Sequence, residues 1–556
     1  MTPPGAGKAR VPGATYARLR PEYPTNGGER RVAEEDAKPA SDEAHSAFTP
    51  PLGVPLPPPP AGEHPTSEFA LPEGVTPGGA PPKPPAVSLI RPEQPWQDRM
   101  RVMLRTPLTE RPSAERIAAP EDETVLPVPR ILDLTLRIGE LLLAGGEGAE
   151  DVEASMFAVG HAFGLDRIET TVTFTLLSVT HQPSLVDDPV TVNRTVRRRG
   201  TDYNRLAAVF RLVDDITDPL VTVTLEDAYR RLAEIRRNRH PYPKWALTVA
   251  SGLLAGAASV LVGGGSLVFV AAAVGAMLGD RLAWTASARG LPEFYQFVLF
   301  AIPPAAVGVA LKFADVDVRY SAVITGGLFA LLPGRALVAA VQDGLTGYYI
   351  TAAARLLEVL YLFVGIIVGV LGVLYVGVRL HAEFDPDLAA VHLERPVTSL
   401  VAAMVLTATF AVLLQQERST VLIVTLNGGV AWLIYGSMHD TADVSPVLST
   451  AVAAGLVGLF GQLLSRYRYA SALPYVTAAI GPLLPGSSTY FGLLGLAQGD
   501  VNGGIRSLLT AATLALAIAV GVNLGGEMAR LFIPQPARGV APGRKERKAS
   551  KRTRGF

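Results

Sequence analysis

The chain has 556 residues, of which 49% are hydrophobic, and its 50 basic and 50 acidic side chains give a formal net charge of zero. A balanced charge provides no overall field that would attract nucleic acid or an anionic surface, so nucleic acid is not an expected partner. The chain contains no cysteine, which excludes disulfides, thiolate nucleophiles and cysteine-based metal sites.

The first part of the chain, residues 1–125, is rich in proline, glycine, glutamate and alanine and includes a run of four prolines at residues 57–60. Such a composition buries too little apolar surface to offset chain entropy, so it predicts a disordered tail. A proline-rich ligand for a partner domain is the alternative. Residues 1–20 contain no apolar core before a cleavage site, so we expect the first spanning helix to direct insertion.

A small α+β domain is predicted over residues 129–243. Apolar residues at helical spacing, each time ending at glycine, indicate the first two helices, and the alternation from Ile168 to Leu176 indicates a half-buried strand. A second strand is expected to pair with it, and two further helices follow. The predicted elements are helices 131–144 and 149–163, strands 168–176 and 190–196, and helices 203–214 and 225–238.

The remainder of the chain, from residue 245 to 533, is a series of apolar stretches separated by short polar joints. Each stretch has about 17–25 residues, the length needed to cross about 30 Å of hydrocarbon. The pattern predicts an all-α polytopic membrane bundle of about ten transmembrane helices. They are expected over residues 245–262, 266–284, 295–311, 320–341, 349–378, 397–414, 420–437, 446–465, 473–496 and 505–532.

The ten predicted helices divide into two halves of five, residues 245–378 and 396–533. Juxtamembrane Lys and Arg stay on the cytoplasmic side, and basic residues gather before the first helix and in the C-terminal tail, residues 534–556. We therefore expect the α+β domain and both termini in the cytoplasm.

A short repeat links the two halves. Leu331-Leu332-Pro333-Gly334 recurs as Leu483-Leu484-Pro485-Gly486, and each copy falls in the fourth helix of its half. Five helices per half place the second copy upside down in the membrane, so the pattern predicts a 5+5 inverted repeat, a plan common among secondary carriers.

The two repeated motifs are the candidate substrate site. A proline followed by glycine in mid-membrane breaks the helix and frees backbone polar groups. The half-helix that begins after each break would aim its positive end into the bundle, where it suits a carboxylate. The candidate substrate-binding residues are Pro333, Gly334, Arg335, Pro485, Gly486, Ser487, Ser488 and Thr489. The alternative is a pair of packing kinks, with Arg335 reaching the membrane surface.

Ionisable residues near the helices are the candidates for proton coupling. Asp343 and Asp500 follow the two breaks at matching places, and Glu358 lies on the fifth helix. Charges in a membrane face a polar path or sit at the interface, and solvation at a helix end remains the alternative for both aspartates. Glu358 is three residues from Arg355 and could simply pair with it.

The acidic residues Glu147, Glu150, Asp151 and Glu153 are interpreted as the solvated first turn of a helix. His161 and His181 have no second ligand at helical spacing, so no metal site is expected. No catalytic constellation and no phosphate-binding loop is found outside the predicted tail, which argues against an enzyme and against an ATP-driven pump.

The chain resembles the threonine/serine exporter family of bacterial inner-membrane carriers. The resemblance covers about residues 130–533, and in the membrane it includes both Leu-Pro-Gly breaks. In the polar domain it rests on Gly139-Glu140-Leu141-Leu142, Gly145, Gly148-Ala149-Glu150-Asp151-Val152-Glu153, Gly164-Leu165, Arg199, Asp202, Leu206, Ala228 and Leu232.

This resemblance implies export of L-threonine and L-serine from the cytoplasm, driven by the proton motive force. The expected partners are the amino acid, protons and the lipid bilayer, with no cofactor; the number of copies in the assembly, including a homo-oligomer, stays open. The alternative function is a membrane-embedded enzyme, or an anchor whose activity resides in the cytoplasmic domain.

Overall fold

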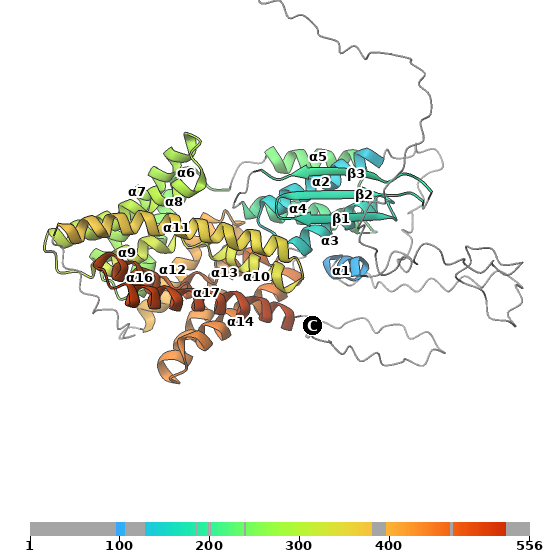
Figure 1. Cartoon of the computed structure of the whole chain (residues 1–556). Coiled ribbons are helices and arrows are strands. Elements are labelled where there is room, and N and C mark those ends of the chain that lie inside the picture. Colours follow the sequence, from blue (N-terminus) through green and yellow to red (C-terminus); the bar gives the residue numbers. More distant parts are fainter. Residues whose placement is uncertain are drawn as a thin grey trace, which may run out of the picture. The chain divides into compact units, whose positions relative to one another are not determined.

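The computed structural model describes residues 96–105, 128–184, 186–197, 200, 202–218, 220–237, 241–380, 396–467 and 471–529. The predicted C-terminal tail and most of the predicted N-terminal tail lie outside these ranges. Within them the protein is mostly helical, with one three-stranded sheet (Figure 1).

One segment of the predicted disordered tail is a helix, α1 (Trp96–Arg105), so the prediction of disorder is wrong there. Trp96, Met100 and Met103 lie on one face of this helix at helical spacing, and all three are buried. The helix packs against α3, and the ring centroid of Trp96 is 5.9 Å from that of Phe210. Three large apolar side chains on one face therefore order a segment whose average composition is polar.

The α+β region, residues 128–237, has four helices around a core of buried leucine, isoleucine and valine. All four lie close to their predicted positions. They are α2 (Val128–Ala144), α3 (Ala149–Ala162), α4 (Tyr203–Thr217) and α5 (Leu225–Arg237). The side chain of Asp202 caps α4 by accepting a hydrogen bond of 2.9 Å from Arg205 N.

The sheet has three antiparallel strands rather than the two predicted. β1 (Ile168–Thr173), β2 (Leu176–His181) and β3 (Val190–Thr195) lie in the order β1-β2-β3. The predicted pairing of the first strand with residues 190–196 is therefore wrong, because β2 lies between them. Phe174, with a φ of 50°, and Thr175 form a two-residue turn that the continuous alternation had concealed.

Eight helices of the described residues are long and apolar enough to span a membrane. Large apolar side chains on their outer faces, including Leu360, Leu422 and Leu509, are exposed in the structure, as lipid-facing residues are. The helices are α6 (Lys244–Leu261), α7 (Ser266–Ala288), α8 (Glu293–Phe313), α11 (Tyr349–Arg379), α12 (Pro396–Leu413), α13 (Arg418–Gly436), which continues as the π-helix η2 (Ser437–Thr441), α14 (Pro446–Tyr467) and α17 (Val501–Ala529).

The other two predicted spans, residues 320–341 and 473–496, are not continuous helices, which corrects the count of about ten. The first is divided into α9 (Tyr320–Phe329) and α10 (Gly334–Leu345). The second is divided into α15 (Leu473–Thr477), the short 3₁₀ turn η3 (Gly481–Leu483) and α16 (Gly486–Gln498). The helices α10 and α16 both begin at the glycine of Leu-Pro-Gly, where proline offers no backbone N–H to the preceding turn.

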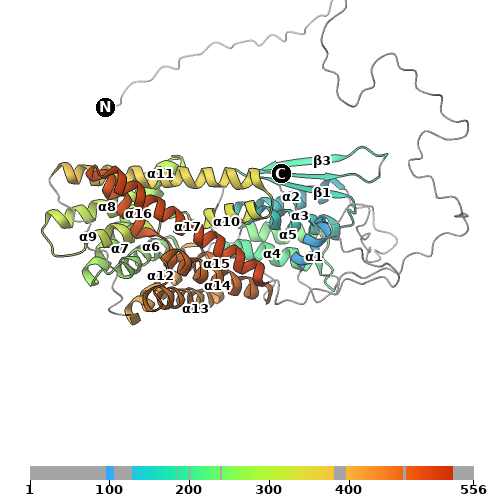
Figure 2. The same ribbon diagram turned by 60° about the horizontal axis from the view of Figure 1, so that its bottom comes forward.

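Helix packing in the second half depends on small residues. Figure 2 shows α17 (red) beside α14 and α16, and both pairs are in contact. A Cβ atom added to Gly525 would lie 1.8 Å from Gly455 O, so the backbones of α17 and α14 approach too closely for any side chain there. Gly521 and Gly525 form the small-xxx-small spacing that permits this approach.

Candidate functional site

The two helix breaks contact each other. A Cβ atom added to Gly486 would lie 2.2 Å from Phe329 Cε2, on the last residue of α9. A Cβ atom added to Gly334 would lie 3.0 Å from Leu484 Cδ2, in the other break. The structure therefore brings together two motifs that are about 150 residues apart in sequence, as the hypothesis of a shared site requires.

The residues after the second break differ in their surroundings. Thr489 is buried, and its hydroxyl donates a hydrogen bond of 2.9 Å to Pro485 O. Ser487 and Ser488 are half-buried at the start of α16. Gly334 begins α10 in the same way as Gly486 begins α16, whereas the side chain of Arg335 lies outside the described part of the structure.

A buried ion pair lies at the far end of α10. Arg355 Nη1 on α11 is 3.2 Å from Asp343 Oδ2, and the two side chains are 4% and 0% exposed. The alternative that Asp343 is solvated at a helix end is therefore wrong. The alternative of a local pair between Arg355 and Glu358 did not include Asp343, the partner of Arg355 that lies twelve residues upstream. A buried pair needs further hydrogen bonds to offset the loss of solvation.

Those hydrogen bonds come from the connection between α2 and α3 and from the first residue of α3. The backbone N of Ala149 donates to Asp343 Oδ1 at 2.8 Å, and Arg355 Nη2 donates to Glu147 O at 2.7 Å. A Cβ atom added to Gly148 would lie 3.0 Å from Gln342 Nε2. The α+β region thus completes an ion pair that the helices of the first half begin.

The side chain of Glu147 connects the same loop to the second half. Ser471, two residues before α15, donates a hydrogen bond of 2.7 Å to Glu147 Oε2. Burial, reinforced by the nearby charge of Asp151, raises the pKa of Glu147 to about 8. Glu147 therefore touches both halves, through its carbonyl oxygen on one side and its carboxyl group on the other.

The acidic residues of α3 are also engaged, so the prediction of a solvated first turn is wrong. Asp151 accepts hydrogen bonds from Arg101 and, at 3.4 Å, from Gln342 Nε2. Glu153 accepts one from the hydroxyl of Tyr348, and burial raises its pKa. Sequence pattern could not distinguish this docked helix start from a solvated one, because acidic residues are favoured in a first helical turn in either case.

Asp500, the counterpart of Asp343 in the repeat, is exposed. Its Oδ1 accepts a hydrogen bond of 3.0 Å from Gly503 N, so it caps the start of α17. Glu358 is half-buried on α11. Of the three candidates for proton coupling, the structure thus places only Asp343 in a buried, charged environment.

A cavity of about 440 Å³ adjoins this junction, between the α+β region and helices α10, α14, α15 and α17. Glu147, Glu150 and Asp151 line it from one side, and Glu527 of α17 and Arg101 of α1 also contribute. A second cavity, of about 470 Å³, shares Arg101 and Glu150 and extends toward Tyr348 and β1. Of the candidate substrate residues whose side chains the structure describes, none lines either cavity.

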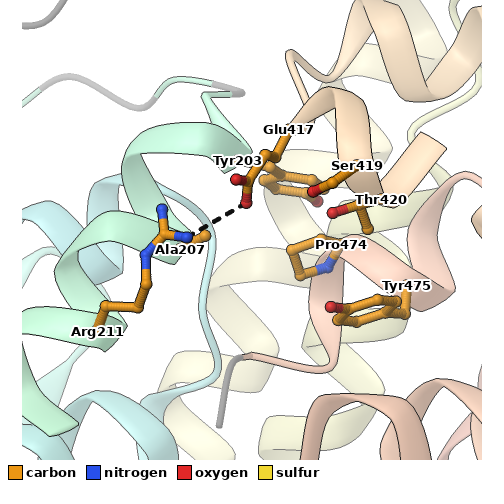
Figure 3. Close-up of a pocket in the computed structure, with 8 residues that line it drawn as sticks. All are labelled: Tyr203, Ala207, Arg211, Glu417, Ser419, Thr420, Pro474 and Tyr475. Atoms are coloured by element: carbon orange, nitrogen blue, oxygen red, sulfur yellow. Dashed lines mark hydrogen bonds and ion pairs between the residues drawn. The ribbon is translucent and has the colours of Figure 1, made fainter. Parts of the chain in front are cut away.

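A smaller cavity of about 140 Å³ lies where α4 meets the joint between α12 and α13 (Figure 3). The backbone N atoms of Tyr203 and Asn204 donate to Leu414 O and Gln415 O at 3.2 and 3.0 Å. Figure 3 shows the ion pair at its rim, with Arg211 Nη1 3.4 Å from Glu417 Oε2. This contact holds the α+β region to the second half.

The sequence pattern does not indicate three residues of the junction, namely Arg101, Tyr348 and Ser471. The available signal was the matching place of Asp343 and Asp500 after the two breaks, in the joints Gln342-Asp343-Gly344 and Gln498-Gly499-Asp500, and it identified Asp343 without its partners. His181 Nδ1 lies 3.0 Å from Arg167 O, and no three side chains of the described ranges are grouped as metal ligands would be.

Comparison with known proteins identifies the family. Residues 133–377 match the family model described as "Putative threonine/serine exporter", and residues 399–526 match the model described as "Threonine/Serine exporter, ThrE". The "Probable threonine/serine exporter" of Mycobacterium tuberculosis is 35% identical over 404 residues, 71% of this chain and 76% of that protein. The "Threonine/serine exporter" of Corynebacterium glutamicum is 30% identical over 415 residues, 72% of this chain and 83% of that protein.

No solved structure matches the chain. One family model covers most of the α+β region with the first half, the other covers most of the second half, and both relatives align with more than two thirds of the chain. This multi-pass membrane protein belongs to the threonine/serine exporter family, a family of transporters rather than enzymes.

Proposed function

We propose that the protein exports L-threonine and L-serine across the bacterial cytoplasmic membrane as a secondary transporter. The observation that carries the proposal is the contact between the two helix breaks in a chain of this family. Interrupted helices that meet near mid-membrane offer free backbone groups to a small polar solute without exposing them to lipid.

The two halves form an inverted repeat in this proposal, with α6–α11 equivalent to α12–α17. The helix contacts support a repeat, because several pairs in one half have a counterpart in the other: α7 with α8 and α13 with α14, α8 with α11 and α14 with α17. Two pairs that cross between the halves also match, since α10 contacts α17 and α16 contacts α11. With each interrupted span counted as one crossing, each half crosses the membrane five times, so the α+β region and both termini would lie on the same side, which their basic residues assign to the cytoplasm.

The substrate site in this proposal is the pair of breaks. The amide groups at the starts of α10 and α16, with Arg335, bind the α-carboxylate, because helix N-termini favour negative charge. Ser487, Ser488 and Thr489 then hold the substrate's polar groups. Pro333 and Pro485 keep the two spans interrupted. Gly334 and Gly486 allow the two breaks to pack closely against each other.

Proton coupling is assigned to Asp343 rather than to Asp500 or Glu358. The buried pair with Arg355 lies where α10, α11 and the α+β region meet, so loss of its charge would loosen all three contacts. A carboxylate in such a place links protonation to the position of the broken helix.

The decisive experiment is efflux of labelled threonine from preloaded cells, with and without a protonophore. We expect efflux that depends on the protein and falls when the protonophore collapses the gradient. Efflux that is independent of the protein would contradict export, and protein-dependent efflux that ignores the protonophore would contradict proton coupling alone.

The substrate site is tested by Arg335→Ala and Ser488→Ala, with Ser445→Ala, in the joint before α14, as the control. We expect a half-saturating threonine concentration raised by about tenfold for Arg335→Ala, since a charge-assisted hydrogen bond contributes about 1.5–3 kcal/mol. If both variants insert normally and transport with unchanged preference, the breaks are packing kinks only.

A further inference from the structure

The cavity of about 440 Å³ has a size and a position that the proposed function leaves unexplained. It falls within the range of about 300–1,000 Å³ typical of small-molecule sites. It is lined by the α+β region on one side and on the other by Val338 of α10 and Val476 of α15. Val338 is one helical turn from the first break, so the cavity leads from the polar domain toward the broken helices.

The charge around this cavity is predominantly negative. Among the described residues, four carboxyl groups line it, from Glu147, Glu150, Asp151 and Glu527, against one guanidinium, that of Arg101. Glu147, whose pKa burial raises to about 8, adds little negative charge at neutral pH. Such a wall attracts cations and disfavours anions. Gln342, Gln462 and Asn523 add amide groups, which donate hydrogen bonds to a carboxylate without adding charge. The lining therefore suits a zwitterion whose ammonium group faces the α+β region.

A cation of the chain itself already occupies the acidic wall. Arg101 donates a hydrogen bond to Asp151, and its Nε lies 3.9 Å from Glu150 Oε2. The side chains of Arg101, Glu150 and Asp151 are 11%, 8% and 12% exposed. These two carboxylates are thus arranged to bind a nitrogen cation away from bulk water, where charge-assisted hydrogen bonds are strong.

Arg101 is carried by α1, a helix of ten residues whose flanking segments lie outside the described ranges. Besides the pair with the wall, α1 is held by Trp96, Met100 and Met103 against α3 and Phe210. Phe210 also lines the cavity. The guanidinium of Arg101 therefore stands where an ammonium group entering from the α+β side would bind.

We propose that this cavity is an intake site at the cytoplasmic face, in which Glu150 and Asp151 bind the α-ammonium group of a small amino acid in place of Arg101. The inference rests on the proposed export function and its orientation. It gives the α+β region a role, because that region supplies both carboxylates and packs against the helix that competes for them.

Transport kinetics give the first test. Asp151→Asn and Glu150→Gln are expected to raise the internal threonine concentration for half-maximal efflux by about tenfold, the effect of losing one charge-assisted contact. Arg101→Gln is expected to lower that concentration, because the competing cation is gone. Glu140→Gln and Arg194→Ala are the matched controls, since Arg194 Nη1 pairs with Glu140 Oε2 at 2.8 Å in the same region, away from the cavity.

Thiol labelling gives a test that does not depend on transport. The chain has no cysteine, so Thr346→Cys places a single thiol in the cavity wall, and Thr191→Cys places one on the exposed strand β3 as control. In inside-out membrane vesicles, an ammonium-bearing methanethiosulfonate should label the thiol at position 346 faster than a sulfonate-bearing one, and threonine should slow that labelling. The preference should shrink when Asp151→Asn is added, and the control should show neither effect.

The outcomes separate this inference from the function on which it rests. The intake site alone would be overturned if the wild-type protein exports threonine and Asp151→Asn and Glu150→Gln leave the half-saturating concentration unchanged. It would also be overturned if labelling at position 346 shows no preference for the cationic reagent or no protection by threonine. Loss of wild-type efflux would overturn the proposed function, whereas the labelling preference would then still report an acidic cavity.

Discussion

The two Leu-Pro-Gly breaks have the same local sequence and different surroundings. In the first half, the last turn of the helix after the break, α10, carries Asp343, which is buried and paired with Arg355. In the second half, the equivalent joint ends at Asp500, which is exposed and caps the next helix. A repeated motif thus forms the same backbone break twice but only one buried charge.

The difference arises from a third element. The connection between α2 and α3 packs on the first joint, where Ala149 N donates to Asp343 and Glu147 O accepts from Arg355. Asp500 bonds locally to the N–H of Gly503 instead. Breaking a helix needs only proline, whereas burying a charge needs partners from elsewhere in the fold.

The largest effect is expected for Asp343→Asn compared with Asp500→Asn. Removing one partner of a buried ion pair leaves Arg355 uncompensated and costs about 3–5 kcal/mol. We expect Asp343→Asn to lose nearly all threonine efflux and to unfold at a clearly lower temperature in detergent, whereas Asp500→Asn should keep most of both. Equal effects of the two substitutions would contradict the conclusion that only the joint at Asp343 contains a buried charge.

The pH dependence of stability is the second test, through Glu147. The folded protein keeps a proton on this carboxyl group up to about pH 8, whereas an unfolded chain loses it near the ordinary glutamate pKa of 4.5. Between these values the folded state binds more protons, so this group's contribution to stability is full below pH 4.5 and is lost as the pH rises toward 8.

Thermal unfolding in detergent from about pH 5 to about pH 8 measures this contribution. Glu147→Gln cannot ionise, so we expect its unfolding temperature to fall less with pH than that of the wild-type protein. Glu140→Gln removes an ion-paired carboxylate from the same region, and its unfolding temperature should change with pH as that of the wild-type protein does. If the unfolding temperature of Glu147→Gln also changes with pH as in the wild-type protein, another group sets the pH dependence.

The breaks themselves are compared by Gly486→Ala and Gly334→Ala. At position 486 the added methyl group would lie 2.2 Å from the ring of Phe329. At position 334 it would lie 3.0 Å from a flexible methyl group of Leu484. Overpacking costs about 1–3 kcal/mol where neighbours cannot move, so Gly486→Ala should lower the unfolding temperature more than Gly334→Ala does. The reverse order would mean that the two breaks do not pack as described.

The smallest effect is expected for Arg211→Ala at the cavity of Figure 3. Arg211 and Glu417 are 54% and 40% exposed, and exposed ion pairs contribute about 0–1 kcal/mol. We expect little change in unfolding temperature or efflux, in contrast to Asp343→Asn. A large loss would mean that contact between the α+β region and the second half is as important as contact with the first.

Local pattern predicted much of this protein. Apolar length predicted the spans, proline with glycine predicted the breaks, and helical spacing predicted α2 to α5 within a few residues. Pattern failed where an alternation continued through the tight turn at Phe174, and where three apolar side chains ordered α1 within a polar tail. In both cases the residues that decide the structure, a two-residue turn and three apolar side chains, form a sequence pattern too short to be recognised among the neighbouring residues.

The sequence by itself therefore determined most of the helical segments, where two of the spans break and which family the chain resembles, because these depend on neighbouring residues. Only the tertiary structure decided that Asp343 is buried against Arg355, that Glu147 touches both halves and that Arg101 lies on the acidic wall of a cavity. Burial and pairing of a charge depend on residues distant in sequence, and no local pattern records which of them the fold brings together.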